Sequence, residues 1–193
     1  MRIVAGEFRG RVIKSPDEAT TRPTIDRVRE SMFSSINSRM DIEGATVLDA
    51  FAGSGALGIE ALSRGAATCL FFEKDEKARA ILNANIKSLD LKAPAVRVMG
   101  GDVIAAAAKP LHFGKPFDLV LLDPPYALSP ERVVAFMEAL KACGSFKEGC
   151  TVAYEHAITN KQEVMAAAEA STVLELDGQK KYGKVGVTYL VVQ

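Results

Sequence analysis

From residue 45 to the end of the chain, short apolar segments alternate with segments of helical length. The near-continuous apolar character of the short segments is typical of strands buried on both faces, as in parallel sheets. The pattern therefore predicts an α/β fold, in which helices cover both faces of a mostly parallel sheet. We expect seven strands, over Thr46–Ala50, Thr68–Glu73, Ala95–Met99, Phe117–Asp123, Cys150–His156, Thr172–Asp177 and Val185–Val192.

Helical patterns lie between most of these strands, over Leu57–Arg64, Asp75–Ser88, Asp102–Lys109, Pro130–Ala142 and Asn160–Ala170. The last two strands lack such a helix, since only Gly178–Lys184 connects them. A short connection joins antiparallel strands, whereas parallel neighbours need a long crossover. We therefore expect a Rossmann-like sheet of six parallel strands and one final reversed strand, with an antiparallel hairpin at one end.

The first forty residues have a different pattern. Arg2–Ala5 and Arg11–Lys14 are typical of two short strands around a glycine-containing turn, so a basic β-hairpin is expected. A helix is predicted over Thr24–Arg39, because apolar side chains recur there at helical spacing. We therefore expect an N-terminal extension over residues 1–40 that binds RNA if the chain is a nucleic-acid enzyme, and a main domain over 41–193.

The formal net charge is zero, from 24 basic and 24 acidic side chains, but the charge is unevenly distributed. Residues 1–16 carry four basic groups and one acid, and residues 178–193 carry three lysines and no acid. Two explanations fit this pattern equally well. Either both chain ends are simply solvated, or they form two basic tips on one face of an acidic body. Tips that share a face would favour a nucleic-acid partner.

With 48% apolar and 25% charged residues, the composition is that of a globular protein rather than a disordered one. No apolar run is long enough to span a bilayer, and the N-terminus lacks the apolar region of a secretory signal. Three cysteines without C-x-x-C spacing indicate reduced thiols, and two histidines give no basis for a metal site. We expect a cytoplasmic monomer that binds neither membrane nor metal.

A glycine-rich turn follows the first predicted strand and opens a predicted helix. It places Gly53, Gly55 and Gly58 in the pattern G-x-G-x-x-G, shortly after Asp49. Glycine permits a tight turn and lets a ligand approach the backbone closely. Between a strand and a helix, the motif favours a nucleotide-containing ligand over a turn that binds nothing.

Acidic side chains follow the next two predicted strands. Glu73 ends the second strand, twenty residues after Gly53, where a carboxylate can accept hydrogen bonds from a ribose diol. Asp102 follows the third strand, and its carboxylate suits either a helix cap or the exocyclic amine of adenine. Both positions suit an adenosine-containing cofactor, which leaves a nicotinamide-dependent oxidoreductase and an S-adenosylmethionine (SAM) methyltransferase as alternatives.

The fourth predicted strand discriminates between these alternatives, because it runs into Asp123, Pro124, Pro125 and Tyr126. Two prolines make the loop rigid, and the loop presents a carboxylate, a carbonyl and an aromatic ring. Two acceptors can hold the exocyclic amine of a base toward a methyl donor and stabilise the positive charge that develops on the nitrogen. The ring can stack on the base. The oxidoreductase hypothesis gives these residues no role.

These motifs resemble those of class I SAM-dependent methyltransferases, and Asp-Pro-Pro-Tyr is the version found in enzymes that methylate exocyclic amines of bases. A closer resemblance, to the RsmD family of bacterial 16S ribosomal RNA guanine-N2 methyltransferases, covers nearly the whole chain. It rests on Arg2–Gly6, Arg9–Arg11, Thr21–Thr24, Arg27–Glu30, Leu48–Arg64 and Lys181–Gly183. The chain departs from the family at Lys181, where arginine is frequent, and lysine lacks the bidentate geometry of arginine toward phosphate.

The resemblance implies a role for each matched residue. Phe51–Gly55 would surround the methionine part of SAM, Glu73 would hold the ribose hydroxyls, and Asp102 the adenine amine. The implied cofactor site comprises Asp49, Phe51, Ala52, Gly53, Ser54, Gly55, Glu73, Asp102 and Asp123. The implied catalytic loop is Asp123, Pro124, Pro125 and Tyr126, in which Asp123 and the Pro124 carbonyl orient guanine N2. RNA would contact Arg2, Arg9, Arg11, Lys14, Arg22 and Lys181.

The resemblance also implies the partner, which is 16S ribosomal RNA or the assembling small ribosomal subunit. The product of the cofactor would be S-adenosylhomocysteine. Taken alone, the Asp123 loop fits any exocyclic amine, so methylation of adenine N6 stays an alternative. A binding module without catalysis is a further alternative, but it would be expected to have lost Gly53, Gly55 or Asp123, and all three are present.

Overall fold

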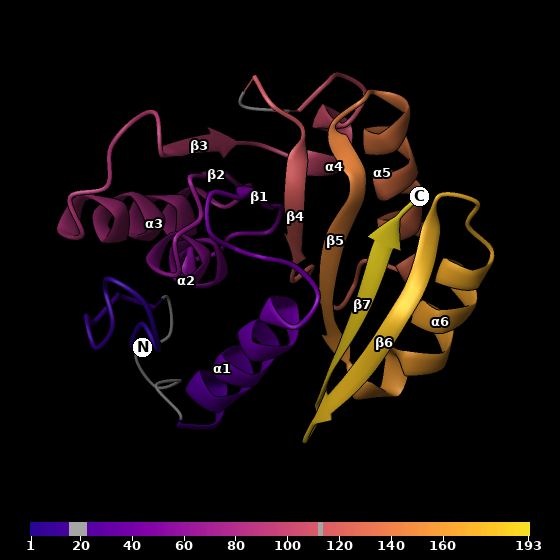
Figure 1. Cartoon of the computed structure of the whole chain (residues 1–193), viewed down its shortest axis with the longest axis horizontal. Helices are drawn as coiled ribbons and strands as arrows, with labels where there is room; N and C mark the ends of the chain where they lie inside the picture. The colour runs from indigo at the N-terminus through magenta and orange to yellow at the C-terminus, as the bar shows by residue number, and fades with distance from the viewer. Residues whose placement is uncertain (16–22, 112–113) are drawn as a thin grey trace.

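The computed structural model describes residues 1–15, 23–111 and 114–193. Through these residues runs a seven-stranded sheet in the order β3-β2-β1-β4-β5-β7-β6 (Figure 1). The strands are β1 (Thr46–Asp49), β2 (Thr68–Glu73), β3 (Val96–Gly100), β4 (Phe117–Leu122), β5 (Phe146–Ala157), β6 (Leu174–Tyr182) and β7 (Val185–Val192). Every strand predicted from the alternating pattern is present, which confirms the α/β fold.

The directions of the strands agree with the prediction. Strands β1 to β5 pair in parallel, and β7 is antiparallel to both of its neighbours, β5 and β6. Six strands therefore run one way and β7 runs the other way. Because β6 shares the direction of β4, its carboxyl end reaches the same edge of the sheet as the carboxyl end of β4.

Two strands are longer than the sequence indicated. Strand β5 begins at Phe146 rather than at Cys150, and β6 continues to Tyr182 rather than ending at Asp177. Most of the predicted connection over 178–184 is therefore strand. Pairing with β7 supplies the backbone hydrogen bonds of this segment, and β6 is an edge strand whose polar side chains face water. Neither effect is visible in local composition.

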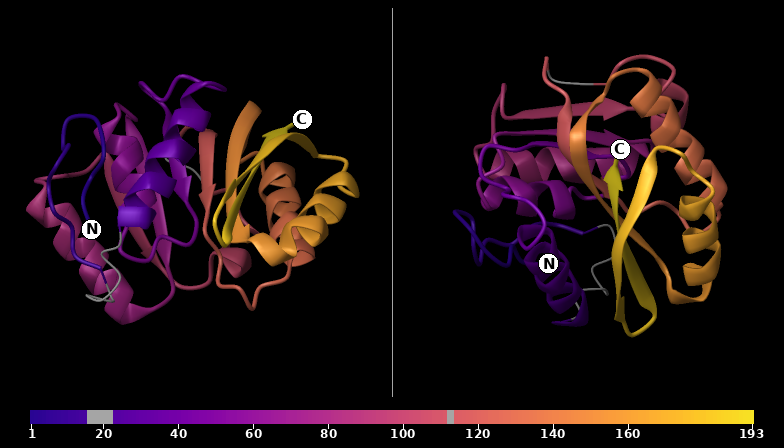
Figure 2. Two further views of the ribbon diagram at one scale, coloured as in Figure 1. Left: turned by 90° about the horizontal axis from the view of Figure 1, so that it is seen from below. Right: turned by 45° about the vertical axis from the view of Figure 1, so that its right-hand side comes forward.

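Helices cover both faces of the sheet (Figure 2). They are α1 (Pro23–Asn37), α2 (Ala56–Ser63), α3 (Glu76–Ser88), α4 (Val103–Ala106), α5 (Pro130–Ala142) and α6 (Lys161–Glu169), with a short 3-10 helix η2 (Ile158–Asn160). Phe33, Ile59 and Leu82 place α1, α2 and α3 in one buried apolar cluster. Phe136 and Val164 place α5 and α6 in a second cluster on the other face. Among the described helices, none is long and apolar enough to cross a membrane.

Helix α4 is much shorter than the predicted Asp102–Lys109. Asp102 lies before the helix and caps it, since its side chain accepts a hydrogen bond from the Ile104 N–H. The helix ends at Ala106, shortly before Pro110. A proline disfavours helical backbone at the residue that precedes it, so the alanine-rich run does not extend to Lys109.

We call residues 1–15 the N-terminal arm. The arm reverses direction as predicted, but its pairing is a single antiparallel bridge between Arg2 and Val12 rather than two regular strands. Backbone hydrogen bonds flank this bridge. Ile3 and Ile13 are buried in the same apolar cluster as Phe33 of α1. The arm and α1 therefore share a core with one face of the sheet.

Candidate active site

The glycine-rich turn links β1 to α2, and each glycine of the motif has its own steric reason. Gly53 and Gly55 adopt positive φ angles of 54° and 85°, where other residues are strained. A Cβ at Gly58 would lie 2.3 Å from the ring of Phe71, so glycine lets α2 pack closely on β2. A Cβ at Gly53 would meet no described atom within 4 Å, so this part of the turn faces open space.

Asp49 ends β1 beneath this turn. Its Oδ2 atom accepts a hydrogen bond of 2.9 Å from the Gly58 N–H, which fixes the turn against the strand. The Oδ1 atom is buried and has no hydrogen-bond partner among the described residues. Burial raises the pKa of Asp49 to about 7. The hydrogen bond from Gly58 lowers this pKa, whereas the negative charges of Asp123 and Glu73 raise it further. A buried carboxylate oxygen is thus left free at the bottom of the site.

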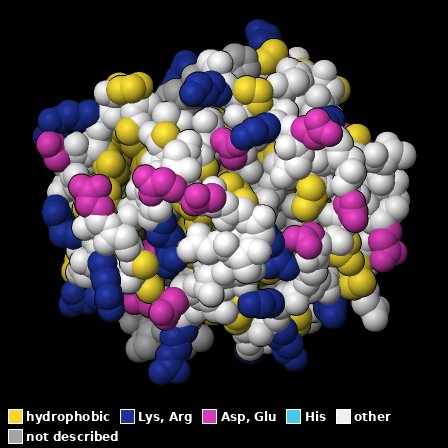
Figure 3. All heavy atoms as spheres, viewed as in Figure 1, with side chains coloured by type: hydrophobic (Ala, Val, Ile, Leu, Met, Phe, Trp, Pro, Cys, Tyr) yellow, Lys and Arg dark blue, Asp and Glu magenta, His cyan; other side chains and the backbone are white. Residues whose placement is uncertain are grey.

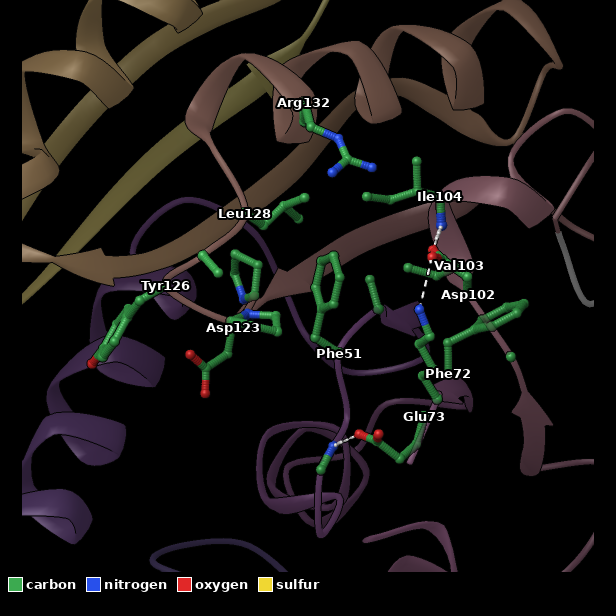
Figure 4. Close-up of a pocket in the computed structure, with 17 residues that line it drawn as sticks. Phe51, Phe72, Glu73, Asp102, Val103, Ile104, Asp123, Tyr126, Leu128 and Arg132 are labelled. Atoms are coloured by element: carbon green, nitrogen blue, oxygen red, sulfur yellow. Dashed lines mark hydrogen bonds and ion pairs between the residues drawn. The ribbon is translucent and has the colours of Figure 1, made fainter. Parts of the chain in front are cut away.

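A cavity of about 600 Å³ opens at the carboxyl ends of β1, β2 and β4 (Figure 4). Its apolar walls include Phe51, Phe72, Val103 and Ile104, and Arg132 points into it from α5. An apolar cavity with polar groups at its edge suits an aromatic base such as adenine. The sequence-predicted Glu73 and Asp102 both line this cavity.

The Glu73 carboxylate joins β2 to the glycine-rich turn. Its Oε2 accepts a hydrogen bond of 2.6 Å from the Gly53 N–H (Figure 4). Its Oε1 accepts one of 2.7 Å from the Asp75 N–H. Each carboxylate oxygen has a second lone pair, so Glu73 can still accept from hydroxyl groups in the cavity. The predicted ribose site is therefore held in place before any ligand binds.

Asp102 acts here as a helix cap, one of the two roles that the sequence left open. Its Oδ1 accepts from the Ile104 N–H at 3.0 Å, and its Oδ2 lies 3.3 Å from Lys74 Nζ. Partial burial works against the charged form, but the contacts with Ile104 and Lys74 outweigh it and lower the pKa of Asp102. The side chain remains at the edge of the cavity, where it is half-exposed.

The loop after β4 lies between this cavity and a second one. Asp123 is exposed to solvent, but desolvation by the protein around its carboxyl group raises the pKa of Asp123 to about 6. Pro124 and Pro125 line the first cavity with Asp123. Tyr126 is 69% exposed and points away from the other labelled side chains in Figure 4. An exposed aromatic ring beside a carboxylate is available to stack on an incoming base.

The second cavity, of about 650 Å³, meets the first at Phe51, Gly53 and Asp123. Its walls come from the arm and α1 (Met1, Val28, Arg29), from the glycine-rich turn, from Glu155 of β5 and from the β6–β7 turn (Tyr182, Gly183, Lys184). Tyr182 is tied to α1, because the Ser31 hydroxyl donates to its phenol oxygen at 2.9 Å. Two ligands placed in the two cavities would therefore meet at Asp123.

The predicted RNA-binding residues are distributed over the arm and β6. Arg2, Arg9, Arg11 and Lys14 are all exposed on the arm, and Arg11 also donates to the Ser88 carbonyl of α3 at 2.6 Å. Figure 3 shows Lys and Arg side chains along the lower left edge, over the area of the arm and α3, interspersed with acidic ones. Arg22 lies outside the described residues.

Of the lysines near the end of the chain, only some lie at the site. Lys181 is exposed on β6 and lines neither of the two cavities, whereas Lys184 lines the second cavity together with Asp123. The reason is topological, since β6 ends at the same edge of the sheet as β4. The turn after β6 therefore returns to the site, and its lysine lies nearer than the strand lysines.

Sequence reasoning missed Glu60, a completely buried carboxylate on α2. It accepts hydrogen bonds from the Val4 and Ala5 N–H groups at 2.9 and 3.0 Å. It also pairs with Arg29 of α1 at 3.3 Å and with Arg64 at 2.9 Å. This residue fastens the arm and α1 to the helix of the glycine-rich turn. The sequence offered one sign of this role, which is a charged residue between Ile59 and Ala61 in an otherwise apolar helix.

A buried asparagine makes a second connection between the arm and the site. Asn85 of α3 accepts from the Lys14 N–H at 2.8 Å and donates to the Lys14 carbonyl at 3.0 Å. Its amide also donates to the Ser54 carbonyl of the glycine-rich turn at 2.9 Å. The conformation of the turn is thereby coupled to the position of the arm.

The observed site fits SAM. The open space over Gly53, the free Oδ1 of Asp49 and the apolar slot beside Glu73 match a cofactor with a charged amino-acid part and an adenosine part. The donor set is poor in metal ligands: within 1–15, 23–111 and 114–193, no group of three or more His, Cys, Asp or Glu could hold a metal ion.

Fold and site together are those of a class I methyltransferase. The chain belongs to the RsmD family, whose model carries the description "Conserved hypothetical protein 95" and matches residues 1–191. The family expected from the sequence motifs is thereby confirmed.

Individual relatives agree with this assignment. The chain is 34% identical over 187 residues to "Putative rRNA methyltransferase YlbH" of Bacillus subtilis, which covers 97% of this chain and 96% of that protein. It is 43% identical over 127 residues to "Ribosomal RNA small subunit methyltransferase D" of Escherichia coli K12, across 65% of this chain and 60% of that protein. The solved structure named "Putative methyltransferase yhhF from Escherichia coli" matches with a TM-score of 0.81 at 29% identity, over 100% of this chain and 98% of that one.

Proposed function

We propose that this protein transfers a methyl group from SAM to the exocyclic N2 of a guanine in 16S ribosomal RNA of the small ribosomal subunit. The observation that carries the proposal is the position of Asp123, which lines both cavities, next to Pro124 in the first cavity. The first cavity suits the adenosine part of the cofactor. The second, which Asp49 also lines, would receive the methionine part and an extruded base. The names of the relatives from Bacillus subtilis and Escherichia coli support ribosomal RNA as the substrate.

The first cavity would hold the adenosine part of the cofactor. Phe51 and Phe72 would contact the adenine ring, and Glu73 would accept hydrogen bonds from the ribose hydroxyls. Asp49 Oδ1 and the turn around Gly53 would face the methionine part. When bound, SAM supplies an electrophilic methyl group on a positively charged sulfur.

The residues of the β4 loop would orient the acceptor. The lone pair of an exocyclic amine is delocalised into the base, so the nitrogen is a weak nucleophile. Asp123 and the Pro124 carbonyl would accept its two hydrogens and align the nitrogen, while Tyr126 stacks on the base. After the nitrogen gains a methyl group it must lose a proton. The carboxylate of Asp123, whose pKa is raised to about 6 by desolvation, would accept it.

The exposed basic groups of the arm would contact RNA phosphates, with Lys184 at the entrance of the second cavity. Phosphate contacts position a nucleic acid without reading its sequence, and a few are sufficient to do so. Such localised contacts are compatible with a net charge of zero. We further propose that residues 1–40 act as an RNA-binding extension and that the protein works in the cytoplasm as a monomer.

The test is to incubate the protein with isotopically labelled SAM and small subunits that lack methylation, and to map the modified nucleotide by mass spectrometry. We expect label on guanine N2. The Asp123→Ala variant should lose methyl transfer and still bind SAM in calorimetry. As a control, Asp41→Ala changes an exposed aspartate near the opposite end of the sheet and should stay active. Label on adenine N6, or full activity of Asp123→Ala, would contradict the proposal.

A further inference from the structure

Glu155 is an acidic residue of the second cavity that neither the sequence motifs nor the proposed mechanism uses. It follows Tyr154 on β5, and Tyr154 pairs in register with Leu122 of the neighbouring strand β4. Leu122 and Tyr154 are both buried in the apolar cluster beneath α5. Because side chains alternate along a strand, Asp123 and Glu155 emerge next to each other on the opposite face. Both line the second cavity.

The Glu155 carboxylate is unpaired. Among the described residues, no hydrogen bond or ion pair to its side chain is present, although Asp123 is close enough to repel it. Burial and the negative charge of Asp123 raise the pKa of Glu155 to about 8. A largely buried carboxyl group without a partner is costly, and such groups concentrate where a ligand completes their hydrogen bonding.

We propose that Glu155 selects guanine by accepting a hydrogen bond from its N1–H, an inference that rests on the proposed function. If Asp123 and the Pro124 carbonyl hold the N2 amine, the next group along the edge of the base is N1. In guanine N1 carries a hydrogen, whereas in adenine the atom next to the amine is a bare acceptor. Two adjacent carboxyl groups match the two adjacent donors of guanine. The N1–H also favours the ionised form of Glu155.

The decisive comparison uses 2-aminopurine, which keeps the amine at C2 but has a bare acceptor at N1. Small subunits are prepared with either guanine or 2-aminopurine at the methylated position, and single-turnover methylation rates are measured for each. For the wild type we expect guanine to react roughly 10- to 100-fold faster, since a hydrogen bond to a charged acceptor is lost with the analogue. In Glu155→Gln this preference should fall at least tenfold, because a rotated amide can donate to N1.

The ratio of the two rates within one variant does not depend on the fraction of folded protein, so partial misfolding of Glu155→Gln does not obscure the result. The control is Glu148→Gln, which makes the same change at an exposed position of the same strand. It should keep the wild-type ratio. If Glu155→Gln slows both substrates equally, Glu155 is structural and the inference is wrong. If the wild type methylates adenine instead, the proposed function fails, and the Glu155 assignment fails with it.

Discussion

The buried carboxylate of Glu60 should decide whether the N-terminal arm stays attached to the protein. Glu60 accepts from two arm amides and two arginines, and its side chain is fully buried. Glu60→Gln keeps the shape but removes the charge, and its amide nitrogen faces donors rather than acceptors. Arg29 and Arg64 then lose their common partner. Removing one charged partner of a buried ion pair costs about 3–5 kcal/mol. This is a large part of the typical free energy of unfolding of a protein, which is about 5–15 kcal/mol.

Urea unfolding measures this cost. With an m value of about 2 kcal/mol per molar urea, the loss corresponds to a midpoint lowered by roughly 2 M. The amides of Val4 and Ala5 should also lose protection from hydrogen exchange, because Glu60 is their acceptor. Glu169→Gln, at an exposed position of α6, should change stability by less than about 0.5 kcal/mol. If Glu60→Gln costs no more than this control, or if both amides stay protected, the reasoning about the arm is refuted.

Three further predictions concern the site and its partners. Glu73→Gln should weaken SAM binding, measured by calorimetry, because the amide offers one acceptor instead of two; an unchanged affinity would remove its ribose role. Glu155→Gln should melt at a higher temperature than the wild type at pH 9, with the difference shrinking toward pH 5. Burial and the charge of Asp123 raise the pKa of Glu155 in the folded protein to about 8, so the wild type loses stability as the pH rises through 8. A difference in melting temperature that does not change with pH would contradict this. Replacing Arg9 and Arg11 by glutamine should weaken RNA binding and reduce the salt slope by about 1.5; an unchanged slope would exclude the arm as the RNA contact.

Local sequence was sufficient to predict a structural feature where the residue type has a single physical use. Gly53 and Gly55 need positive φ angles, and the proline pair after Asp123 makes a rigid loop at the end of a strand. The order of apolar strands and helices was also sufficient to predict the strand directions of the sheet, since two strands connected by a helix run parallel. The sequence did not tell which side of the sheet the turn with Lys184 faces, and only the structure places this lysine at the second cavity.

Element boundaries were less predictable because they depend on partners that are distant in the sequence. Strand β6 reaches Tyr182 because β7 supplies its hydrogen bonds. Helix α4 is an exception, since the proline that follows it is a local signal. Asp102 had two equally reasonable uses, and only the placement of Ile104 and Lys74 makes it a cap in this structure. The pairing of β6 with β7 and the contact of Asp102 with Lys74 join residues that are distant in the sequence.

The sequence by itself determined the fold class and the loop that would carry the chemistry, because these depend on the period of apolar residues and on the conformations that glycine and proline allow. The family was identified from the resemblance of its motifs. Only the tertiary structure placed Glu155 beside Asp123 and brought Glu60 to the arm. These neighbours are separated by 32 and by more than 50 positions in the chain. A carboxylate has the same appearance in a sequence whether it faces water, an arginine or another carboxylate. Its energy depends on burial and on neighbouring charges, which arise only when the strands and helices are assembled.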